Sequence, residues 1–156
     1  MGTEIERKFL VTDDSWKTSD PVYYCQGYLN RDKYRTVRVR IAQDQGFLTI
    51  KGPTVGATRS EYEYVIPLED AQELLGLCDK PLVEKYRRII RYKGMSWEVD
   101  EFLGDNQGLV VAEIELDSES QAFDLPTWVG KEVTNDPKYF NSRLSSKPYS
   151  TWGIDD

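Results

Sequence analysis

Apolar and polar residues alternate with a period of two along much of this chain, which is the pattern of β-strands that have two different faces. Alternating stretches predict strands at 3–11, 22–30, 35–42, 46–51, 60–67, 83–93, 95–103 and 109–117. Turn-forming residues separate these stretches, and Lys93-Gly94 is typical of a tight hairpin. Eight strands joined in this way favour an antiparallel barrel or a strongly curved sheet.

Three helices are predicted between and after the strands. They are expected at 69–79, 117–125 and 136–146, with a single helical turn at 13–17. Pro126 is expected to end the second helix, whereas Asp136 and Pro137 are suited to the cap and the first helical position of the third. We expect these helices to cover part of the apolar face of the sheet.

One face of most predicted strands carries full charges two residues apart. The pairs are Glu4 and Glu6, Arg38 and Arg40, Glu61 and Glu63, Lys85 and Arg87, Glu98 and Asp100, and Glu113 and Glu115, with Lys8 and Lys51 as single bases. For any one strand, a solvated outer face is the ordinary explanation. The whole set is sorted by sign from strand to strand, and like charges that face one another destabilise a sheet. This sorting indicates that the charges face something bound between them.

A sheet that closes with its charged face inward would enclose a polar channel. Eight strands leave room for side chains or one small ligand. Arginine and lysine bind phosphate oxygens, arginine in forked contacts, and carboxylates bind hard divalent cations. The pattern therefore predicts a site for a chain of phosphates and a divalent metal ion.

Length and composition narrow the class of protein. The 156 residues favour a single domain, 1–156, and the net charge of −7 argues against a duplex nucleic acid as partner. The chain has no histidine, which excludes a Ser-His-Asp system, and with only two cysteines it argues against a structural zinc site. No apolar stretch is long enough to cross a membrane and no signal-peptide pattern is present. Cys25 and Cys78 are expected to be reduced thiols of a cytoplasmic protein, with a disulfide as the alternative.

Several motifs resemble one known family. EIERK at 4–8 is similar to the ExExK signature of the CYTH superfamily, the triphosphate tunnel metalloenzymes, and the opening MGTEIERKFLV is similar to the short bacterial members that hydrolyse inorganic triphosphate. The resemblance continues through RVR, LTIKG, EYEY, EKYR, WEVDEF and AEIEL, so that it covers almost the whole chain.

This resemblance implies a mainly β, α+β fold: an eight-stranded antiparallel closed barrel with a charged interior, covered by a few helices. The substrate-binding residues that it implies are Lys8, Tyr28, Arg38, Arg40, Lys51, Lys85 and Arg87. The implied metal ligands are Glu4, Glu6, Glu61, Glu63, Asp100, Glu113 and Glu115, with the orienting of bases as the alternative role for Glu61 and Glu63. Glu4, Glu6 and Lys8 form the implied catalytic group. Glu98 has the same parity but is not assigned to the metal set. For Tyr28, a place in the core or at the rim is the alternative.

The predicted function is metal-dependent hydrolysis of a linear triphosphate, most of all inorganic triphosphate, to pyrophosphate and phosphate with Mg²⁺ or Mn²⁺. Alternatives within the family are hydrolysis of thiamine triphosphate or a nucleoside triphosphate, and adenylate cyclisation, which the missing histidine disfavours. A non-catalytic polyphosphate or nucleotide receptor is the alternative of another class, although such a receptor has no use for so many carboxylates. The expected partner is a small-molecule triphosphate, with no nucleic acid or membrane, and the chain is expected to be a monomer or homodimer.

Overall fold

The structure is a computed structural model that describes residues 2–153. Its strands are β1 (Gly2–Val11), β2 (Val22–Asn30), β3 (Thr36–Ala42), β4 (Gln45–Lys51), β5 (Thr58–Ile66), β6 (Val83–Tyr92), β7 (Met95–Phe102), β8 (Val110–Glu115) and β9 (Val129–Glu132). Its α-helices are α1 (Leu68–Leu77) and α2 (Asn141–Leu144), and short 3₁₀ turns occur at Gly104–Asn106, Pro137–Tyr139 and Tyr149–Thr151.

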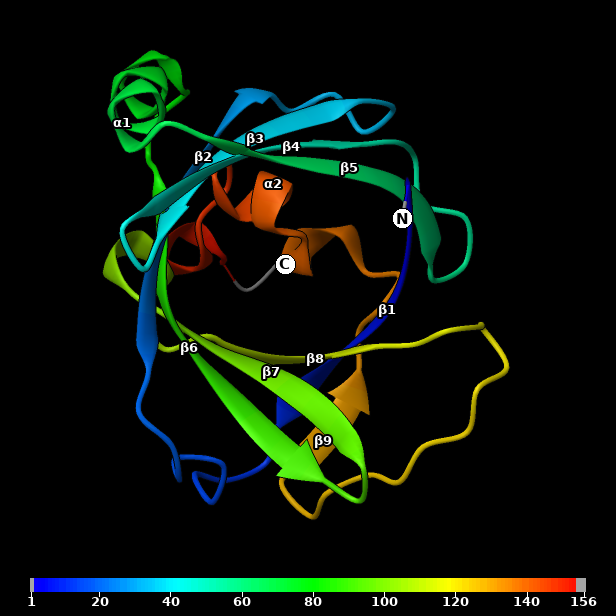
Figure 1. Cartoon of the computed structure of the whole chain (residues 1–156). Helices are drawn as coiled ribbons and strands as arrows, with labels where there is room; N and C mark the ends of the chain where they lie inside the picture. Colours follow the sequence, from blue (N-terminus) through cyan, green and yellow to red (C-terminus); the bar gives the residue numbers. More distant parts are fainter. Residues whose placement is uncertain (1, 154–156) are drawn as a thin grey trace.

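Eight strands form a closed antiparallel barrel, as predicted. Neighbouring strands follow the order β5-β4-β3-β2-β6-β7-β8-β1, and pairing between β5 and β1 closes the ring. Figure 1 looks along the bore of this ring. Only the first part of β1, Gly2–Ile5, pairs with β5, and β9 lies beside the last part of β1 instead.

The hairpin at Lys93-Gly94 is confirmed. Tyr92 pairs with Met95, and Lys93 and Gly94 have φ angles of 47° and 80°. Positive φ at both central residues is the geometry of a two-residue turn that matches the twist of its strands. Gln43 and Asp44 form the equivalent turn between β3 and β4. As a result, β4 begins at Gln45, one residue before the predicted start of this strand.

The apolar core lies outside the barrel wall, between the strands and the segments that cover them. Phe9, Trp97 and Ile114 pack with Trp16 and Trp128 from two covering loops. On another side, α1 packs Ala71 and Leu75 against Val39. A third group joins Leu144 of α2 to Val83, Phe102, Leu109 and Val111. Because the apolar residues are covered on the outside, the charged face of each strand is left to the interior.

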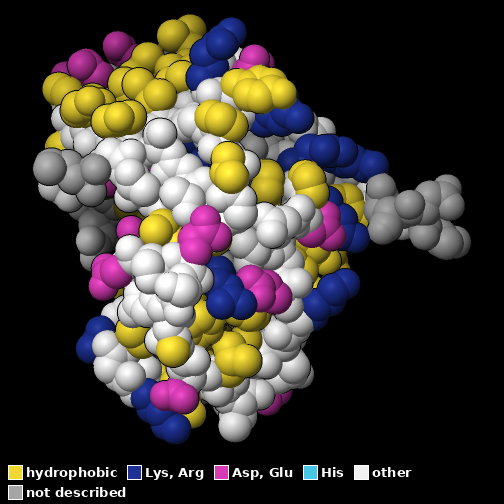
Figure 2. Space-filling model, turned by 90° about the vertical axis from the view of Figure 1, so that its right-hand side faces the viewer, with side chains coloured by type: hydrophobic (Ala, Val, Ile, Leu, Met, Phe, Trp, Pro, Cys, Tyr) yellow, Lys and Arg dark blue, Asp and Glu magenta, His cyan; other side chains and the backbone are white. Residues whose placement is uncertain are grey.

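Part of the outer surface remains apolar. Tyr62, Tyr64 and Val65 of β5 are exposed, as is Ile50 of β4. Figure 2 shows apolar side chains gathered on the upper part of one face, at the height of β4 and β5 in Figure 1. Lower on the same face, acidic and basic side chains are mixed.

Two helix predictions were wrong. Residues 117–125 form no helix: Asp117 donates its backbone N–H to Gln121 Oε1 at 2.6 Å, and Phe123 packs against Phe9 and Trp97. A single aromatic anchor does not make the apolar stripe that stabilises a short helix. Residues 136–146 are split between the turn at Pro137–Tyr139 and α2, because Phe140 has an extended backbone between them. Asp136 nevertheless caps the turn by accepting from the backbone N–H of Lys138.

Two further observations bear on the predictions. Cys25 and Cys78 are free thiols, as expected. Within residues 2–153, no helix has the length and apolar character that crossing a membrane requires.

Candidate active site in the barrel interior

The interior of the barrel contains a polar cavity of about 220 Å³. The residues predicted from the sequence lie together here, since all of them except Asp100 line the cavity. The reason is the period of the strands: once the apolar face is covered outside, residues i and i+2 of the other face both point inward. Thr36, Thr54 and Thr134 add neutral polar groups to the lining.

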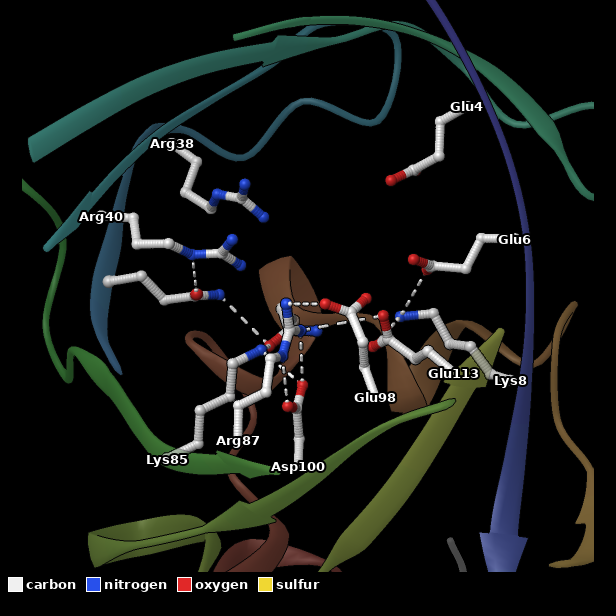
Figure 3. Close-up of polar contacts among 12 residues, drawn as sticks. Glu4, Glu6, Lys8, Arg38, Arg40, Lys85, Arg87, Glu98, Asp100 and Glu113 are labelled. Carbon is white, nitrogen blue, oxygen red and sulfur yellow. Dashed lines mark hydrogen bonds and ion pairs between the residues drawn. The ribbon is translucent and has the colours of Figure 1, made fainter. Parts of the chain in front are cut away.

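Arginine and lysine gather on one wall of the cavity. Arg38 and Arg40 come from β3, Lys85 and Arg87 come from β6, and β2 lies between these two strands. Figure 3 shows the four side chains pointing into the bore from the side opposite Glu4, Glu6 and Lys8. We call Arg38, Arg40, Lys85 and Arg87 the basic wall.

The bases of this wall repel one another. Burial, followed by the charges of Arg38 and Arg87, lowers the pKa of Arg40 to about 9. Burial also lowers the pKa of Lys85 to about 7, together with Arg87 and Arg40, although Asp100 opposes the shift. A bound anion would relieve both shifts, because opposite charge favours the charged form of a base.

Asp100 lies beneath the basic wall and is fully buried. Its Oδ1 accepts from Arg87 Nε at 2.7 Å, and its Oδ2 accepts from Arg87 Nη2 at 2.9 Å. The Nζ of Lys85 is 2.7 Å from the same Oδ2. Both carboxylate oxygens are therefore engaged by bases and do not face the cavity. The sequence had instead placed Asp100 among the metal ligands. Burial alone would raise the pKa of Asp100, but Arg87 and Lys85 outweigh it and lower the pKa.

Three carboxylates converge between Arg87 of the basic wall and Lys8 of β1. Oxygens of Glu6, Glu98 and Glu113 lie within 4.8 Å of one another, a closeness that no other three acidic residues share in the part of the chain described here. We call these residues the carboxylate cluster. They come from β1, β7 and β8, which are neighbours in the barrel. A site made only of carboxylate oxygens fits a hard divalent cation, so the residues present suit the predicted metal.

The pKa values of Glu6 and Glu113 within the carboxylate cluster are shifted in opposite directions. Burial raises the pKa of Glu6, and the nearby Glu113 and Glu4 raise it further. Burial also acts on Glu113, but Lys8 and Arg87 outweigh it and hold the pKa of Glu113 well below its usual value. The Nζ of Lys8 lies 3.4 Å from Glu113 Oε1 and 3.7 Å from Glu6 Oε1. A metal cation bound here would, like Lys8, compensate part of the negative charge of the carboxylate cluster.

The remaining predicted residues lie along the β1–β5 seam and around it. Lys51 Nζ contacts Glu4 at 3.1 Å and Glu61 at 3.3 Å. Glu63 accepts from Arg38 Nη2 at 3.4 Å, and its side chain is 41% exposed. Glu115 also lines the cavity, but like Glu4, Glu61 and Glu63 it stands apart from the carboxylate cluster. Tyr28 is buried and lines the cavity.

Some cavity residues carry no signal in the alternating pattern of the predicted strands. Arg59 lines the cavity on the same face of β5 as Glu61, and it was missed because the strand was predicted to begin at residue 60 instead of Thr58. Phe140, Asn141 and Ser142 also line the cavity. Figure 1 shows why, since α2 lies across the bore. Alternation along strands gives no signal for such residues. Glu98 had the right parity but had been left out of the metal set.

Comparisons with known proteins agree with this geometry. The family model described as CYTH domain matches residues 2–146. The chain is 51% identical over 154 residues to an inorganic triphosphatase of Acetivibrio thermocellus, an alignment that covers 97% of this chain and 99% of the relative. It is 36% identical over 148 residues to an inorganic triphosphatase of Nitrosomonas europaea, covering 92% of this chain and 97% of that relative.

A solved structure has the same fold. The crystal structure of an inorganic triphosphatase superposes with a TM-score of 0.66 at 34% sequence identity, covering 90% of this chain and 96% of that one. The matches to the family model, to the two relatives and to this structure each extend over nearly the whole chain. The chain therefore belongs to the CYTH domain family.

Proposed function

We propose that this protein hydrolyses inorganic triphosphate to pyrophosphate and phosphate with Mg²⁺ or Mn²⁺. The observation that carries the proposal is a cavity in the barrel bore that is lined both by the basic wall and by the carboxylate cluster. The names of the two relatives, both inorganic triphosphatases, support the same reaction. In it, a water oxygen bonds to a terminal phosphorus, the bridging P–O bond breaks and pyrophosphate leaves.

The basic wall binds the substrate in this proposal. A linear triphosphate carries its charge along its whole length, and the guanidinium groups of Arg38, Arg40 and Arg87 offer several donors each to its oxygens. Lys85 and Lys51 add point charges, and Tyr28 offers a hydroxyl to a terminal phosphate. Asp100 holds Lys85 and Arg87 in place from below and does not itself touch the substrate.

The carboxylate cluster holds the metal. Glu6, Glu98 and Glu113 are the proposed principal ligands, and Glu4, Glu61, Glu63 and Glu115 support the site from the seam. When bound, a divalent cation neutralises charge on phosphate oxygens and lowers the pKa of a coordinated water.

Lys8 acts as a cation in this scheme and not as a base. Burial would lower its pKa, but Glu113, Glu6 and Glu4 outweigh that effect and raise it. Lys8 therefore remains protonated and can donate to a phosphate oxygen between the carboxylate cluster and the substrate.

A substrate panel tests the reaction. The full chain is incubated with inorganic triphosphate, thiamine triphosphate, ATP or GTP, each with Mg²⁺ or Mn²⁺, and phosphate release and cyclic nucleotide formation are measured. We expect the fastest release from inorganic triphosphate and none in excess EDTA. Cyclic AMP as the main product, or faster hydrolysis of an organic triphosphate, would overturn the proposed substrate. Binding of triphosphate without turnover would indicate a receptor.

One substitution tests the carboxylate cluster. Glu6→Gln keeps the size of the side chain and removes its charge, so we expect hydrolysis to be lost while the circular dichroism spectrum is unchanged. Glu69→Gln, on the exposed side of α1, is the matched control and should keep the wild-type rate. Wild-type turnover by Glu6→Gln would contradict the metal site.

We further propose that the protein acts in the cytoplasm as a single domain, as a monomer or homodimer, without a nucleic acid or membrane partner. The negative net charge supports the absence of a nucleic acid partner. The molar mass in solution from light scattering, with and without inorganic triphosphate, tests the oligomeric state.

A further inference from the structure

Two neutral amide side chains connect the basic wall to the C-terminal segment. Arg40 Nε donates to Gln26 Oε1 at 2.9 Å, and Gln26 Nε2 donates to Asn141 Oδ1 at 3.2 Å. Lys85 Nζ donates to the same Asn141 Oδ1 at 3.1 Å. Three hydrogen bonds thus join Arg40 of β3 to Lys85 of β6 by way of β2 and α2. We call Gln26 and Asn141 the amide bridge.

The orientation of both amides follows from the two charges at the ends of the bridge. Arginine and lysine have donors and no acceptors. Arg40 therefore requires the oxygen of Gln26, which leaves the Gln26 nitrogen as donor to Asn141. Lys85 also donates to Asn141, so that only the oxygen of Asn141 can satisfy both neighbours. The amide bridge is the arrangement that two hydrogen-bond donors, Arg40 at one end and Lys85 at the other, require.

The surroundings hold the amide bridge in one place. Gln26 is fully buried, and Asn141 lines the cavity. Three residues after Asn141, the fully buried Leu144 packs into the apolar group outside β6, β7 and β8. Arg31 then binds Ser145, with Nε donating to Oγ and Nη2 donating to the backbone oxygen, both at 2.9 Å. Asn141 is thus fixed from its own segment as well as from the barrel.

The amide bridge adds no charge to the cavity. Asp100 already provides the negative charge next to Lys85 at 2.7 Å. The neutral oxygen of Asn141, as a second partner of Nζ, directs the ammonium without adding a negative charge that weakens its attraction for an anion. A second carboxylate at that place would compete with a phosphate for the same base.

We propose that Gln26 and Asn141 are positioning residues, which direct Arg40 and Lys85 toward the phosphate chain of the substrate. The C-terminal segment thereby forms part of the binding site as well as a cover for the bore. This inference rests on the proposed function, because it assigns the residues a role in binding inorganic triphosphate. Its effect falls on substrate binding, since the basic wall lies opposite Glu6 and Lys8 (Figure 3).

Steady-state kinetics of Asn141→Ala test the proposal. We expect KM for inorganic triphosphate to rise about tenfold, which corresponds to about 1.4 kcal/mol of binding free energy, and kcat to change less than twofold. Ser146→Ala is the matched control, because the Ser146 hydroxyl donates to Arg143 O within the same segment and lies away from the cavity. It should keep the wild-type KM. If Asn141→Ala does not fold, Asn141→Ser is measured with the same expectation.

Measuring the same substitution in a Lys85→Met protein distinguishes a positioning role of Asn141 from a purely structural one. In Lys85→Met the ammonium that Asn141 contacts directly is absent and only the indirect path through Gln26 to Arg40 remains, so adding Asn141→Ala should raise KM by a clearly smaller factor than in the wild-type protein. A loss of general stability would instead raise KM by the same factor in both backgrounds, and that result would overturn the proposal. An unchanged KM in the single variant would also overturn it. If the wild-type protein itself fails to hydrolyse inorganic triphosphate, the proposed function fails first.

Discussion

The ion pairs beneath the basic wall allow a sharp test of what Asp100 does. Asp100→Asn keeps the shape of the side chain but removes the charge that faces the fully buried Lys85 and the largely buried Arg87. Removing one partner of a buried pair costs about 3–5 kcal/mol, because the other charges remain buried without compensation. Lys85 has a pKa of about 7 and can give up its proton, whereas Arg87 cannot, so we expect the lower end of this range, about 3 kcal/mol.

Thermal unfolding of the ligand-free protein measures this loss. For a chain of this length, 1 kcal/mol corresponds to about 2–4 °C, so Asp100→Asn should lower Tm by about 6–12 °C. Glu98→Gln is the comparison on the same strand: Glu98 accepts from Arg87 Nη1 at 2.9 Å, but its side chain is 31% exposed. An ion pair that water reaches contributes about 0–1 kcal/mol. Equal Tm values for the two variants would refute our account of Asp100.

The pH dependence of this difference has a definite sign. The pKa of Asp100 in the folded protein is below the ordinary value of 3.8, despite burial, because of Arg87 and Lys85. Its stabilisation is therefore complete above the unfolded pKa and is lost as the pH falls through the folded pKa. The Tm difference between wild type and Asp100→Asn should be largest at neutral pH and shrink in acid. A difference that grows in acid would contradict the assignment.

Two further predictions concern the carboxylate cluster and the packing of α1. Burial and neighbouring carboxylates raise the pKa of Glu6, so the metal-free protein should lose stability as the pH rises through that pKa. Measurements of Tm against pH in EDTA should show this loss of stability, and Glu6→Gln should abolish the pH dependence. A Cβ at position 46 would lie 2.5 Å from Ala71 Cβ, so Gly46→Ala should cost about 1–3 kcal/mol in urea unfolding by displacing α1. Gly76→Ala, with nothing within 4 Å of the added methyl, should instead stabilise the helix by up to about 1 kcal/mol; a loss at Gly76 as large as at Gly46 would contradict this reasoning.

The barrel and most of its lining were predictable because strand parity is a local property. In EIERK, Glu4, Glu6 and Lys8 must share a face of the strand. Because these side chains are charged, that face turns away from the apolar segments that cover the outside of the barrel. The same argument applied to each strand assembled the cavity without any knowledge of the pairing. It failed at Arg59 only because the start of β5 was placed two residues late.

Depth along the bore was not predictable in this way. Glu98 and Asp100 are two residues apart on the same face of β7, yet one lines the cavity and the other lies beneath it. The register decides the difference, since Asp100 lies directly opposite Arg87 on β6, and Glu98 lies opposite Glu113 on β8. Register depends on contacts between distant segments, so the local pattern could not tell that Asp100 would pair with bases while Glu98 would line the cavity. Asn141 escaped for the related reason that a short helix gives no sign of entering a barrel.

The charges of the cavity explain why its two halves belong to one site. Arg87 binds Asp100 below, donates to Glu98 at 2.9 Å and lies 3.9 Å from Glu113. It is therefore shared between the basic wall and the carboxylate cluster. A cation bound by Glu98 and Glu113 would weaken their hold on Arg87 and leave its guanidinium to phosphate oxygens. A polyanion that takes Arg87 would in turn free the two carboxylates. Because such coupling between two ligands is reciprocal, metal ion and triphosphate should each bind more tightly when the other is present.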